Sequence, residues 1–198
     1  SSAASDVYKR QNMNIGATSP EKAGNIYAWA EVEVKDTYSK ENYSFYDAAT
    51  QTFEPVGEQR ESIYYNVAEE MNDTVNVYDI QGSGYDMAAH ELGENWTTPT
   101  LEQYGELMQY CTWTWTTQNG VNGYLVTASN NNSIFLPAAG IYINEDISGN
   151  GISFYYWTAN MPSSTSDQAY QFVGYRDYAT SLMPGNRFSG CPVRAVCK

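Results

Sequence analysis

Short strings of aromatic, proline and glycine residues recur through the C-terminal half of the chain, and they limit its possible folds more than any other feature. Between them, the segment from Leu101 to Met108 has apolar residues at the three- and four-residue spacing of a helix, and Thr100 with Gln103 forms a capping box. A shorter helix is expected from Asp86 to Leu92, closed by Gly93. The strings are, in order, Trp96, Pro99-Thr100, Thr112-Trp113-Thr114-Trp115, Leu136-Pro137-Ala138-Ala139-Gly140, Tyr156-Trp157 and Arg187-Phe188-Ser189-Gly190-Cys191-Pro192-Val193-Arg194.

The other patterned segments favour strands. Ser62 to Val67 and Thr74 to Ile80 carry β-branched and aromatic residues on either side of a polar bridge from Glu69 to Asp73, which is typical of a hairpin. A long loop is expected from Gly140 to Gly151. Two short helices among many short strands and long loops indicate an α+β fold in preference to a sandwich. Further strands are expected at Tyr124 to Thr127 and Ser133 to Leu136, with a turn at Asn130-Asn131-Asn132.

Acidic residues dominate the charge of the chain. It has 23 Asp and Glu against ten Lys and Arg, a formal net charge of −13 at pH 7. Nucleic-acid binding needs clustered basic residues that neutralise phosphates, so this class is excluded. No apolar run approaches the roughly 20 residues of a membrane helix, and we expect no membrane insertion. Eighteen Tyr and five Trp favour a β-rich protein with aromatic contact surfaces.

The first eleven residues have a separate origin. Ser1 to Gln11 is what the transposon adapter used to build sequencing libraries encodes in this reading frame. The native part is therefore expected to begin at about Asn12, with its export signal lost, in a gene fragment from a metagenome. Residues 12–198 contain no linker or repeat, so we expect one domain. The adapter-encoded residues are expected to make few contacts with it.

The ordered strings resemble the Fibrobacter succinogenes major paralogous domain. This is a C-type-lectin-like module of secreted and surface proteins in gut Bacteroidetes and Fibrobacter, related to the variable proteins of diversity-generating retroelements. The resemblance implies a C-type-lectin-like fold and noncovalent binding of a protein or glycan ligand, without catalysis. It implies an extracellular or cell-surface location, in a bacterial or phage-encoded protein.

Two expectations follow from departures from the family pattern. In C-type-lectin-like folds the first and last strands pair, so loss of the first strand would leave the segment from Val193 to Val196 with an open edge. The family usually has Arg after the Trp at position 96, where this chain has Thr97-Thr98. If that Arg normally forms an ion pair in the core, the residue that pairs with it must find another binding partner in this chain.

The resemblance places variable ligand-binding positions between the Tyr-Trp segment and the closing Arg-containing string, from Phe154 to Cys191. Because Tyr155, Tyr156 and Trp157 are consecutive, a strand cannot bury all three, and at least one is expected to be exposed. Aromatic anchors mixed with small polar groups suit ligand recognition. The alternative is a structural surface or adhesin module without a pocket. The candidate ligand-binding residues are Tyr155, Thr158, Asn160, Tyr175, Arg176, Asp177, Tyr178, Phe188 and Ser189.

No catalytic residue, cofactor or metal is assigned. His90 has no second His at i+4 and is expected to be an exposed helix residue. Cys191 and Cys197 flank a predicted strand, and formylglycine-generating oxidases with a related fold use a redox-active pair. An enzyme of that kind is a second alternative, although structural or free thiols are favoured.

Other polar residues have structural interpretations. The acid pairs Glu31/Glu33 and Glu69/Glu70 are expected to lie on solvated faces. Oxygen ligands for calcium occur at Asn144-Glu145-Asp146 with Asn150, but their spacing does not match an EF-hand. Trp113 and Trp115 are expected to pack in the core. Arg194 is expected to bind a carboxylate or main-chain carbonyls.

Overall fold

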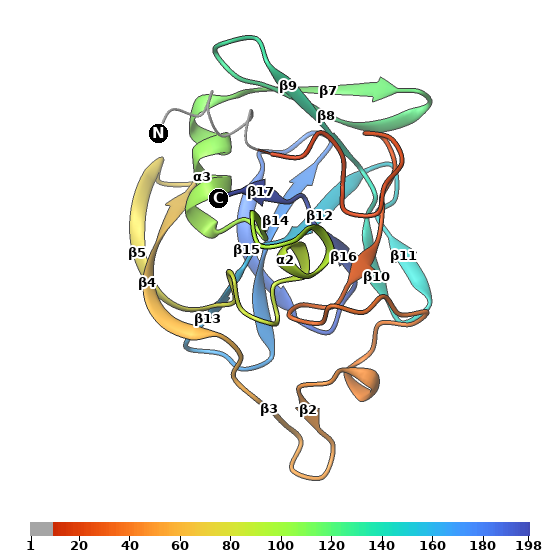
Figure 1. Ribbon diagram of the computed structural model, residues 1–198. Helices are drawn as coiled ribbons and strands as arrows, with labels where there is room; N and C mark the ends of the chain where they lie inside the picture. Colours follow the sequence, from red (N-terminus) through yellow and green to blue (C-terminus); the bar gives the residue numbers. More distant parts are fainter. Residues whose placement is uncertain (1–9) are drawn as a thin grey trace.

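The computed structural model describes residues 10–198, in which short strands predominate over helix (Figure 1). The helices are α2 (Met87–Leu92), α3 (Leu101–Tyr110) and the 3-10 helix η1 (Lys40–Asn42), so the predicted α+β class is confirmed. The strands are β1 (Ile26–Tyr27), β2 (Tyr46–Asp47), β3 (Thr52–Phe53), β4 (Glu58–Asn66), β5 (Met71–Asp79), β6 (Trp96–Thr97), β7 (Thr112–Gln118), β8 (Val121–Thr127), β9 (Ser133–Pro137), β10 (Ile141–Ile143), β11 (Asp146–Ser148), β12 (Ser153–Trp157), β13 (Asn160–Pro162), β14 (Gln168–Tyr175), β15 (Ser181–Asn186), β16 (Cys191–Pro192) and β17 (Val196–Cys197).

The strands form several small antiparallel sheets. The three-stranded sheets have the orders β12-β14-β15, β7-β8-β9 and β13-β5-β4. Two-stranded pairs join β1 to β16, β6 to β17, β2 to β3 and β10 to β11. In Figure 1 the β7-β8-β9 sheet lies at the top, the β4-β5 hairpin at the left, and β12, β14 and β15 run through the middle. The central sheet therefore connects elements that lie far apart in the sequence.

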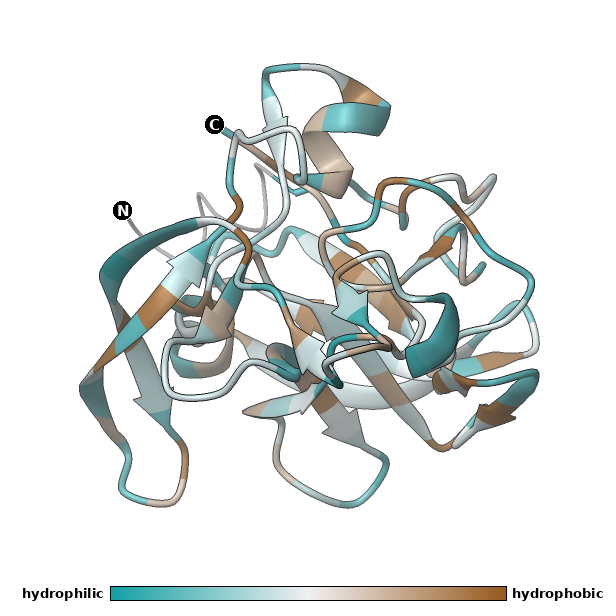
Figure 2. Cartoon of the chain, turned by 90° about the horizontal axis from the view of Figure 1, so that it is seen from below, coloured by the Kyte–Doolittle hydropathy of each residue, from teal (hydrophilic) through white to brown (hydrophobic). Residues whose placement is uncertain are grey.

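Strand β12 is buried because it contributes to two clusters of the core. Phe154 and Tyr156 point into a cluster with Tyr104 and Phe172, whereas Trp157 belongs to a second cluster. Alternation along a strand sends successive side chains to opposite faces, which explains the division. Burial of each such aromatic stabilises the fold by about 2 to 3 kcal/mol. Figure 2 shows hydrophobic residues along the strands of the interior and hydrophilic residues in the outer loops.

Both predicted helices are confirmed, together with their caps. The Thr100 side chain accepts a hydrogen bond from the Gln103 amide at 3.3 Å, and the Gln103 side chain accepts one from the Thr100 amide at 3.0 Å. Asp86 is the N-cap of α2, and Gly93 closes this helix with a φ of 89°. Glycine tolerates this left-handed backbone, which explains why the helix ends there.

The Asp86 carboxylate also binds the Thr97-Thr98 segment. It accepts hydrogen bonds from the hydroxyls of Thr97 at 2.6 Å and Thr98 at 2.7 Å, and from the Thr98 amide at 2.9 Å. It is fully buried and also accepts from the Gly82 amide at 2.8 Å. This buried carboxylate is thus satisfied by hydroxyl and amide donors.

The expectation of an open edge near the C-terminus is wrong. Arg10 forms a β-bridge with Val196, the Gln11 amide donates to the Ala195 carbonyl at 3.0 Å, and the Ile15 amide donates to the Val193 carbonyl at 3.1 Å. Backbone pairing needs no particular side chain, so residues before Asn12 can cover this edge.

The expectation of few contacts by Ser1 to Gln11 is wrong for its last two residues, and residues 1–9 lie outside the described part. Arg10 is 5% exposed, and its guanidinium lies 4.9 Å from the centre of the Tyr104 ring. It also donates to the Gln103 carbonyl at 2.6 Å. Cation–π attraction and this hydrogen bond explain the burial of Arg10.

Other expectations are corrected in detail. The predicted hairpin exists as β4-β5, but its turn spans residues 67–70, because Asp73 pairs with Tyr64 inside the ladder. The expected loop from Gly140 to Gly151 contains the β10-β11 hairpin. Glu31 is buried rather than solvated, since it pairs with Lys35 and accepts a hydrogen bond from the Ser44 amide at 2.7 Å.

The expected structural role of Arg194 is confirmed. Its guanidinium is fully buried and donates to Asn14 Oδ1 at 2.8 Å and to the Phe135 carbonyl at 2.7 Å. It donates to the Gln11 carbonyl at 3.2 Å as well. Arg194 therefore holds the N-terminal segment, β9 and the C-terminal segment together through neutral acceptors.

Candidate functional site

Three tyrosines from the predicted window converge on one surface. Tyr155 pairs across β12 and β14 with Val173, so Tyr175, two residues further along β14, is its diagonal neighbour on the same face of the sheet. The hydroxyl oxygens of Tyr155 and Tyr175 are 2.5 Å apart, and their rings meet edge to face with centroids 6.0 Å apart. Tyr178 continues the row, with its ring centroid 6.5 Å from that of Tyr175. We call these three residues the tyrosine face.

The three side chains of the tyrosine face differ in their exposure to solvent. Tyr155 is half-buried, whereas Tyr175 is 38% exposed and Tyr178 is 75% exposed. Desolvation raises the pKa of the Tyr155 hydroxyl, and the hydrogen bond with Tyr175 raises it further. Tyr155 is therefore neutral at neutral pH. The prediction that at least one of the consecutive aromatics 155–157 is exposed holds only in part, because Tyr155 is half-buried and Tyr156 and Trp157 are fully buried.

The turn after β14 carries Arg176 and Asp177 beside the tyrosine face. Their charged groups are 3.9 Å apart and both side chains are largely exposed, so this ion pair contributes little to stability. The Tyr124 hydroxyl lies near the carbonyl oxygens of Tyr175 and Arg176, at 2.8 and 3.1 Å. These contacts tie the turn to strand β8.

A cavity of about 300 Å³ adjoins the tyrosine face. It lies where the β4-β5 turn, the end of α3, the β7-β8 strands and the β14-β15 turn meet. Tyr178 belongs to both the cavity and the tyrosine face. The cavity is lined chiefly by Tyr65, Glu70, Met108, Trp113, Tyr124 and Tyr178.

Sequence reasoning missed most of this cavity. Trp113 was expected to be core, and it does pack against Tyr124 and Phe172 with ring centroids 5.7 Å away in each case. It is nevertheless only partly buried, and one side reaches the cavity. Alternation along strands can place a residue on a face, but it cannot show which distant elements meet there.

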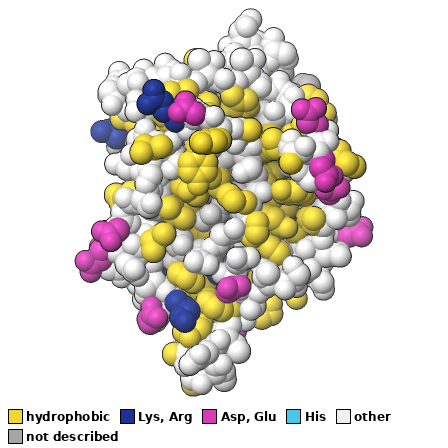
Figure 3. All heavy atoms as spheres, turned by 180° about the vertical axis from the view of Figure 1, so that it is seen from behind, with side chains coloured by type: hydrophobic (Ala, Val, Ile, Leu, Met, Phe, Trp, Pro, Cys, Tyr) yellow, Lys and Arg dark blue, Asp and Glu magenta, His cyan; other side chains and the backbone are white. Residues whose placement is uncertain are grey.

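Hydrophobic side chains also gather across the middle of the molecular face seen from behind Figure 1, with charged side chains around the margin (Figure 3). The chain is rich in acidic residues that could cover its surface, but few charged side chains lie in the middle of this face. An apolar area of this kind is the usual character of a surface that meets another molecule.

Two predicted site residues, Thr158 and Asn160, are fully buried. Asn160 Oδ1 accepts a hydrogen bond from the Leu101 amide at 3.0 Å, which satisfies the first turn of α3. The Thr158 hydroxyl lies 2.9 Å from the Tyr170 carbonyl and accepts from the Asn160 amide at 3.1 Å. These contacts hold backbone segments together, so neither side chain belongs to the exposed site.

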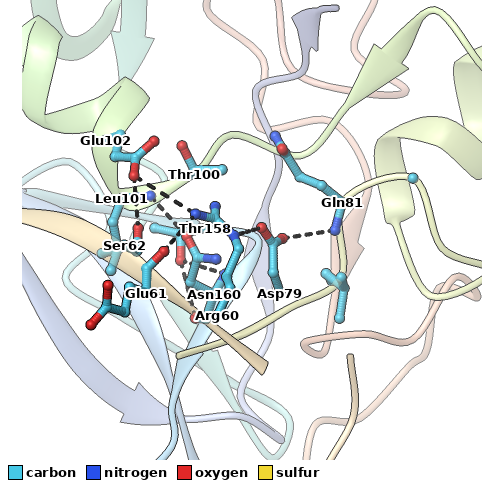
Figure 4. A network of polar contacts seen from close by, with 12 residues as sticks. Arg60, Glu61, Ser62, Asp79, Gln81, Thr100, Leu101, Glu102, Thr158 and Asn160 are labelled. Carbon is cyan, nitrogen blue, oxygen red and sulfur yellow. Dashed lines mark hydrogen bonds and ion pairs between the residues drawn. The ribbon is translucent and has the colours of Figure 1, made fainter. Parts of the chain in front are cut away.

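Both residues lie in a wider polar network, drawn in Figure 4. Arg60 forms an ion pair with Asp79, and its guanidinium is also 3.7 Å from the Glu102 carboxylate. The Gln81 side chain extends the network by donating to the Thr98 carbonyl at 2.9 Å. The network joins β4, β5 and the start of α3.

The last two predicted residues, Phe188 and Ser189, lie in another part of the core. Phe188 is half-buried and stacks on Phe53 with ring centroids 6.3 Å apart, and Ser189 is 2% exposed. The structure thus brings Tyr155, Tyr175, Arg176, Asp177 and Tyr178 together and separates the other four predicted residues from them.

The two cysteines of the enzyme alternative lie in different strand pairs. Cys191 in β16 pairs with β1, whereas Cys197 in β17 pairs with β6. Cys191 is fully buried and accepts a hydrogen bond from Gln171 Nε2 at 3.4 Å. Burial raises the pKa of its thiol well above the ordinary value, which disfavours the reactive thiolate. His90 is exposed on α2, as predicted.

Among residues 10–198, no group of three or more His, Cys, Asp or Glu side chains is placed to hold a metal ion. In the same residues, no helix is long and apolar enough to cross a bilayer. Comparisons with known protein families, with curated proteins and with solved structures find no match.

Proposed function

We propose that this protein is a noncovalent binding module that takes a protein or glycan ligand on the tyrosine face. The observation that carries the proposal is the row of Tyr155, Tyr175 and Tyr178, held edge to face and increasingly exposed. Tyrosine offers a large contact area with few rotamers to freeze, so such rows are effective anchors. Arg176 and Asp177 add adaptable polar contacts at the edge.

The proposal includes a C-type-lectin-like domain of the major paralogous type, on an exported or phage-encoded protein. Its support is the order of strings in the sequence and the pairing of the segment around Ile15 with the C-terminal segment, where the Ile15 amide donates to the Val193 carbonyl at 3.1 Å. A retroelement that diversifies this window would leave a near-repeat of its coding sequence beside a reverse-transcriptase gene. Those neighbours are the genomic signature to seek.

The direct test is a screen of the full chain against arrayed surface glycans and surface proteins. A variant carrying both Tyr175→Ala and Tyr178→Ala is expected to weaken binding by about tenfold or more, because each exposed anchor contributes about 1 kcal/mol or more. Tyr85→Ala is the control, since Tyr85 is similarly exposed but contacts Phe45 elsewhere. Equal binding by the double variant and the wild type would reject the tyrosine face as the site.

A further inference from the structure

The cavity beside the tyrosine face combines aromatic walls with one carboxylate. Tyr65, Trp113, Tyr124 and Tyr178 line it, and Glu70 adds the acid. No Lys, Arg, Asn or Gln is found among the described residues that line it. The faces of aromatic rings carry negative charge density, and the carboxylate has the same sign. The cavity is therefore complementary to positive charge.

Two polar groups of its walls are engaged elsewhere. The Trp113 indole N–H donates to the Leu107 carbonyl at 3.1 Å, and the Tyr124 hydroxyl is bound by the turn after β14. A sugar, with several hydroxyl groups to satisfy, would have the hydroxyls of Tyr65, Tyr178 and Thr180 and the Glu70 carboxylate as its partners. An anion would be repelled by the Glu70 carboxylate. An apolar group that carries a positive charge needs no hydrogen bonds and is attracted both by the rings and by the carboxylate.

The same chain already holds a cation in this way. The Arg187 guanidinium is fully buried among Trp29, Tyr43, Phe45 and Phe53, at 5.1 to 5.8 Å from their ring centres. By contrast, the cation–π contacts within residues 10–198 use none of the four cavity rings. Arg176, the base nearest in sequence to Tyr178, pairs with Asp177. The cavity rings thus remain available to an external cation.

We propose that this cavity binds an organic cation of the alkylated ammonium class, such as the trimethylammonium group of choline or of a methylated lysine. A volume of about 300 Å³ is at the small end of ligand pockets and suits such a group. This inference rests on the proposed function, because Tyr178 belongs to both sites. A ligand on the tyrosine face would then carry the cation as one of its recognised groups.

The test is titration of the full chain with choline and with its neutral isostere, in which a tert-butyl group replaces the trimethylammonium group. Binding is followed by calorimetry and by the indole N–H resonance of Trp113. Choline is expected to bind saturably and about tenfold more tightly than the isostere, since the two differ in charge and not in shape. Equal affinities, or no saturable binding of choline, would overturn the proposal.

Paired variants locate the binding. Glu70→Gln is expected to weaken choline binding by about threefold to tenfold, whereas Glu69→Gln, one residue away and outside the lining, changes it by less than about twofold. Tyr178→Leu, which keeps an apolar side chain, should weaken it by about fivefold or more, against little change for Tyr110→Leu. Choline binding unaffected by both Glu70→Gln and Tyr178→Leu would place the cation elsewhere and overturn the proposal.

Phosphocholine and a peptide with a trimethylated lysine separate the possible sources. The phosphate brings negative charge near Glu70, so phosphocholine should bind more weakly than choline, while the peptide should match or exceed choline. Tighter binding of phosphocholine would contradict the charge argument. A ligand from the array screen that needs Tyr175, without any choline binding, would remove this inference and leave the proposed function. Choline binding without any ligand from the array screen would remove the proposed function and leave this inference.

Discussion

At the scale of single residues, Arg187 is the most unusual side chain of the core. It is fully buried, and it donates to the Tyr43 hydroxyl at 2.7 Å, to the Ser166 carbonyl at 2.8 Å and to Met161 Sδ at 3.7 Å. A buried charge without a counter-charge normally carries a large desolvation cost. Four aromatic rings and neutral acceptors offset that cost here, and they fix the β2-β3 segment against the rest of the molecule.

Arg187→Lys is expected to lower the free energy of unfolding by about 2 to 4 kcal/mol. The ammonium cannot span the fork geometry of the guanidinium, so Tyr43 or Ser166 loses its partner in a buried site. Urea denaturation measures the change. Arg176→Lys is the matched control, because Arg176 is exposed and should change stability by less than about 0.5 kcal/mol. Similar effects of the two substitutions would contradict the stabilising role of the guanidinium of Arg187.

Asn160→Ala is expected to lower the free energy of unfolding by about 1 to 2 kcal/mol, because the Leu101 amide at the start of α3 loses its acceptor. Affinity for any ligand found in the array screen should stay within about twofold of wild type. Thermal unfolding and binding are measured on the same sample. A loss of affinity without loss of stability would restore Asn160 to the binding site.

At the scale of elements, the segments specified locally could be predicted from the sequence. The capping box of Thr100 and Gln103 and the closing Gly93 act within a few residues, so both helices were recognised. The β10-β11 hairpin was missed because its segment, Gly140 to Gly151, is rich in Gly and Asn, which are typical of loops. The pairing of β10 with β11 becomes apparent only in the folded backbone.

The link between α2 and the Thr97-Thr98 segment gives a prediction at this scale. Asp86→Ala is expected to lower the free energy of unfolding by about 3 kcal/mol or more, because it removes the helix cap and leaves buried hydroxyl and amide donors without an acceptor. Chemical denaturation tests it, with exposed Glu94→Ala as the control. A cost below about 1 kcal/mol would show that water or a neighbour replaces the carboxylate.

At the scale of the whole molecule, buried tyrosines make stability depend on pH in the alkaline range. Burial raises the pKa of Tyr27 to about 12, and it raises the pKa values of Tyr43 and Tyr104 as well. Below about pH 10 these groups are neutral in both states and contribute no dependence. Above it, the unfolded chain ionises first, so each such tyrosine lowers the free energy of unfolding by about 1.4 kcal/mol per pH unit until its folded pKa is reached.

These tyrosines should therefore leave stability unchanged up to about pH 10 and make it fall steeply toward pH 12. The buried Cys191 thiol, whose pKa is also raised, adds a smaller loss that begins near its unfolded pKa of about 8.5. Ultraviolet absorbance should show Tyr27, Tyr43 and Tyr104 ionising only with unfolding. Denaturation midpoints across this range provide the second measurement. Ionisation of all tyrosines in one step near pH 10, with no loss of stability, would contradict the assigned burial.

The candidate site could be predicted only in part, for a reason that belongs to the whole molecule. The consecutive aromatics at 155–157 drew attention to Tyr155, which is half-buried rather than exposed, and the composition of the window drew attention to Tyr175 and Tyr178. Thr158 and Asn160 have the same polar character, but the fold uses them to hold α3. The cavity draws its walls from four separate elements, and no local pattern specifies that meeting.

The central claim is that ligand recognition occurs on the tyrosine face, and hydrogen exchange with a ligand from the array screen tests it most directly. Amide protection is expected along residues 152–157 and 173–180, with a smaller effect near the β4-β5 turn at residues 67–70. Helix α2 and the β2-β3 hairpin, which contribute no residue to the tyrosine face, should exchange at their unliganded rates. Protection centred on α2 or β2-β3, with residues 173–180 unchanged, would contradict the claim.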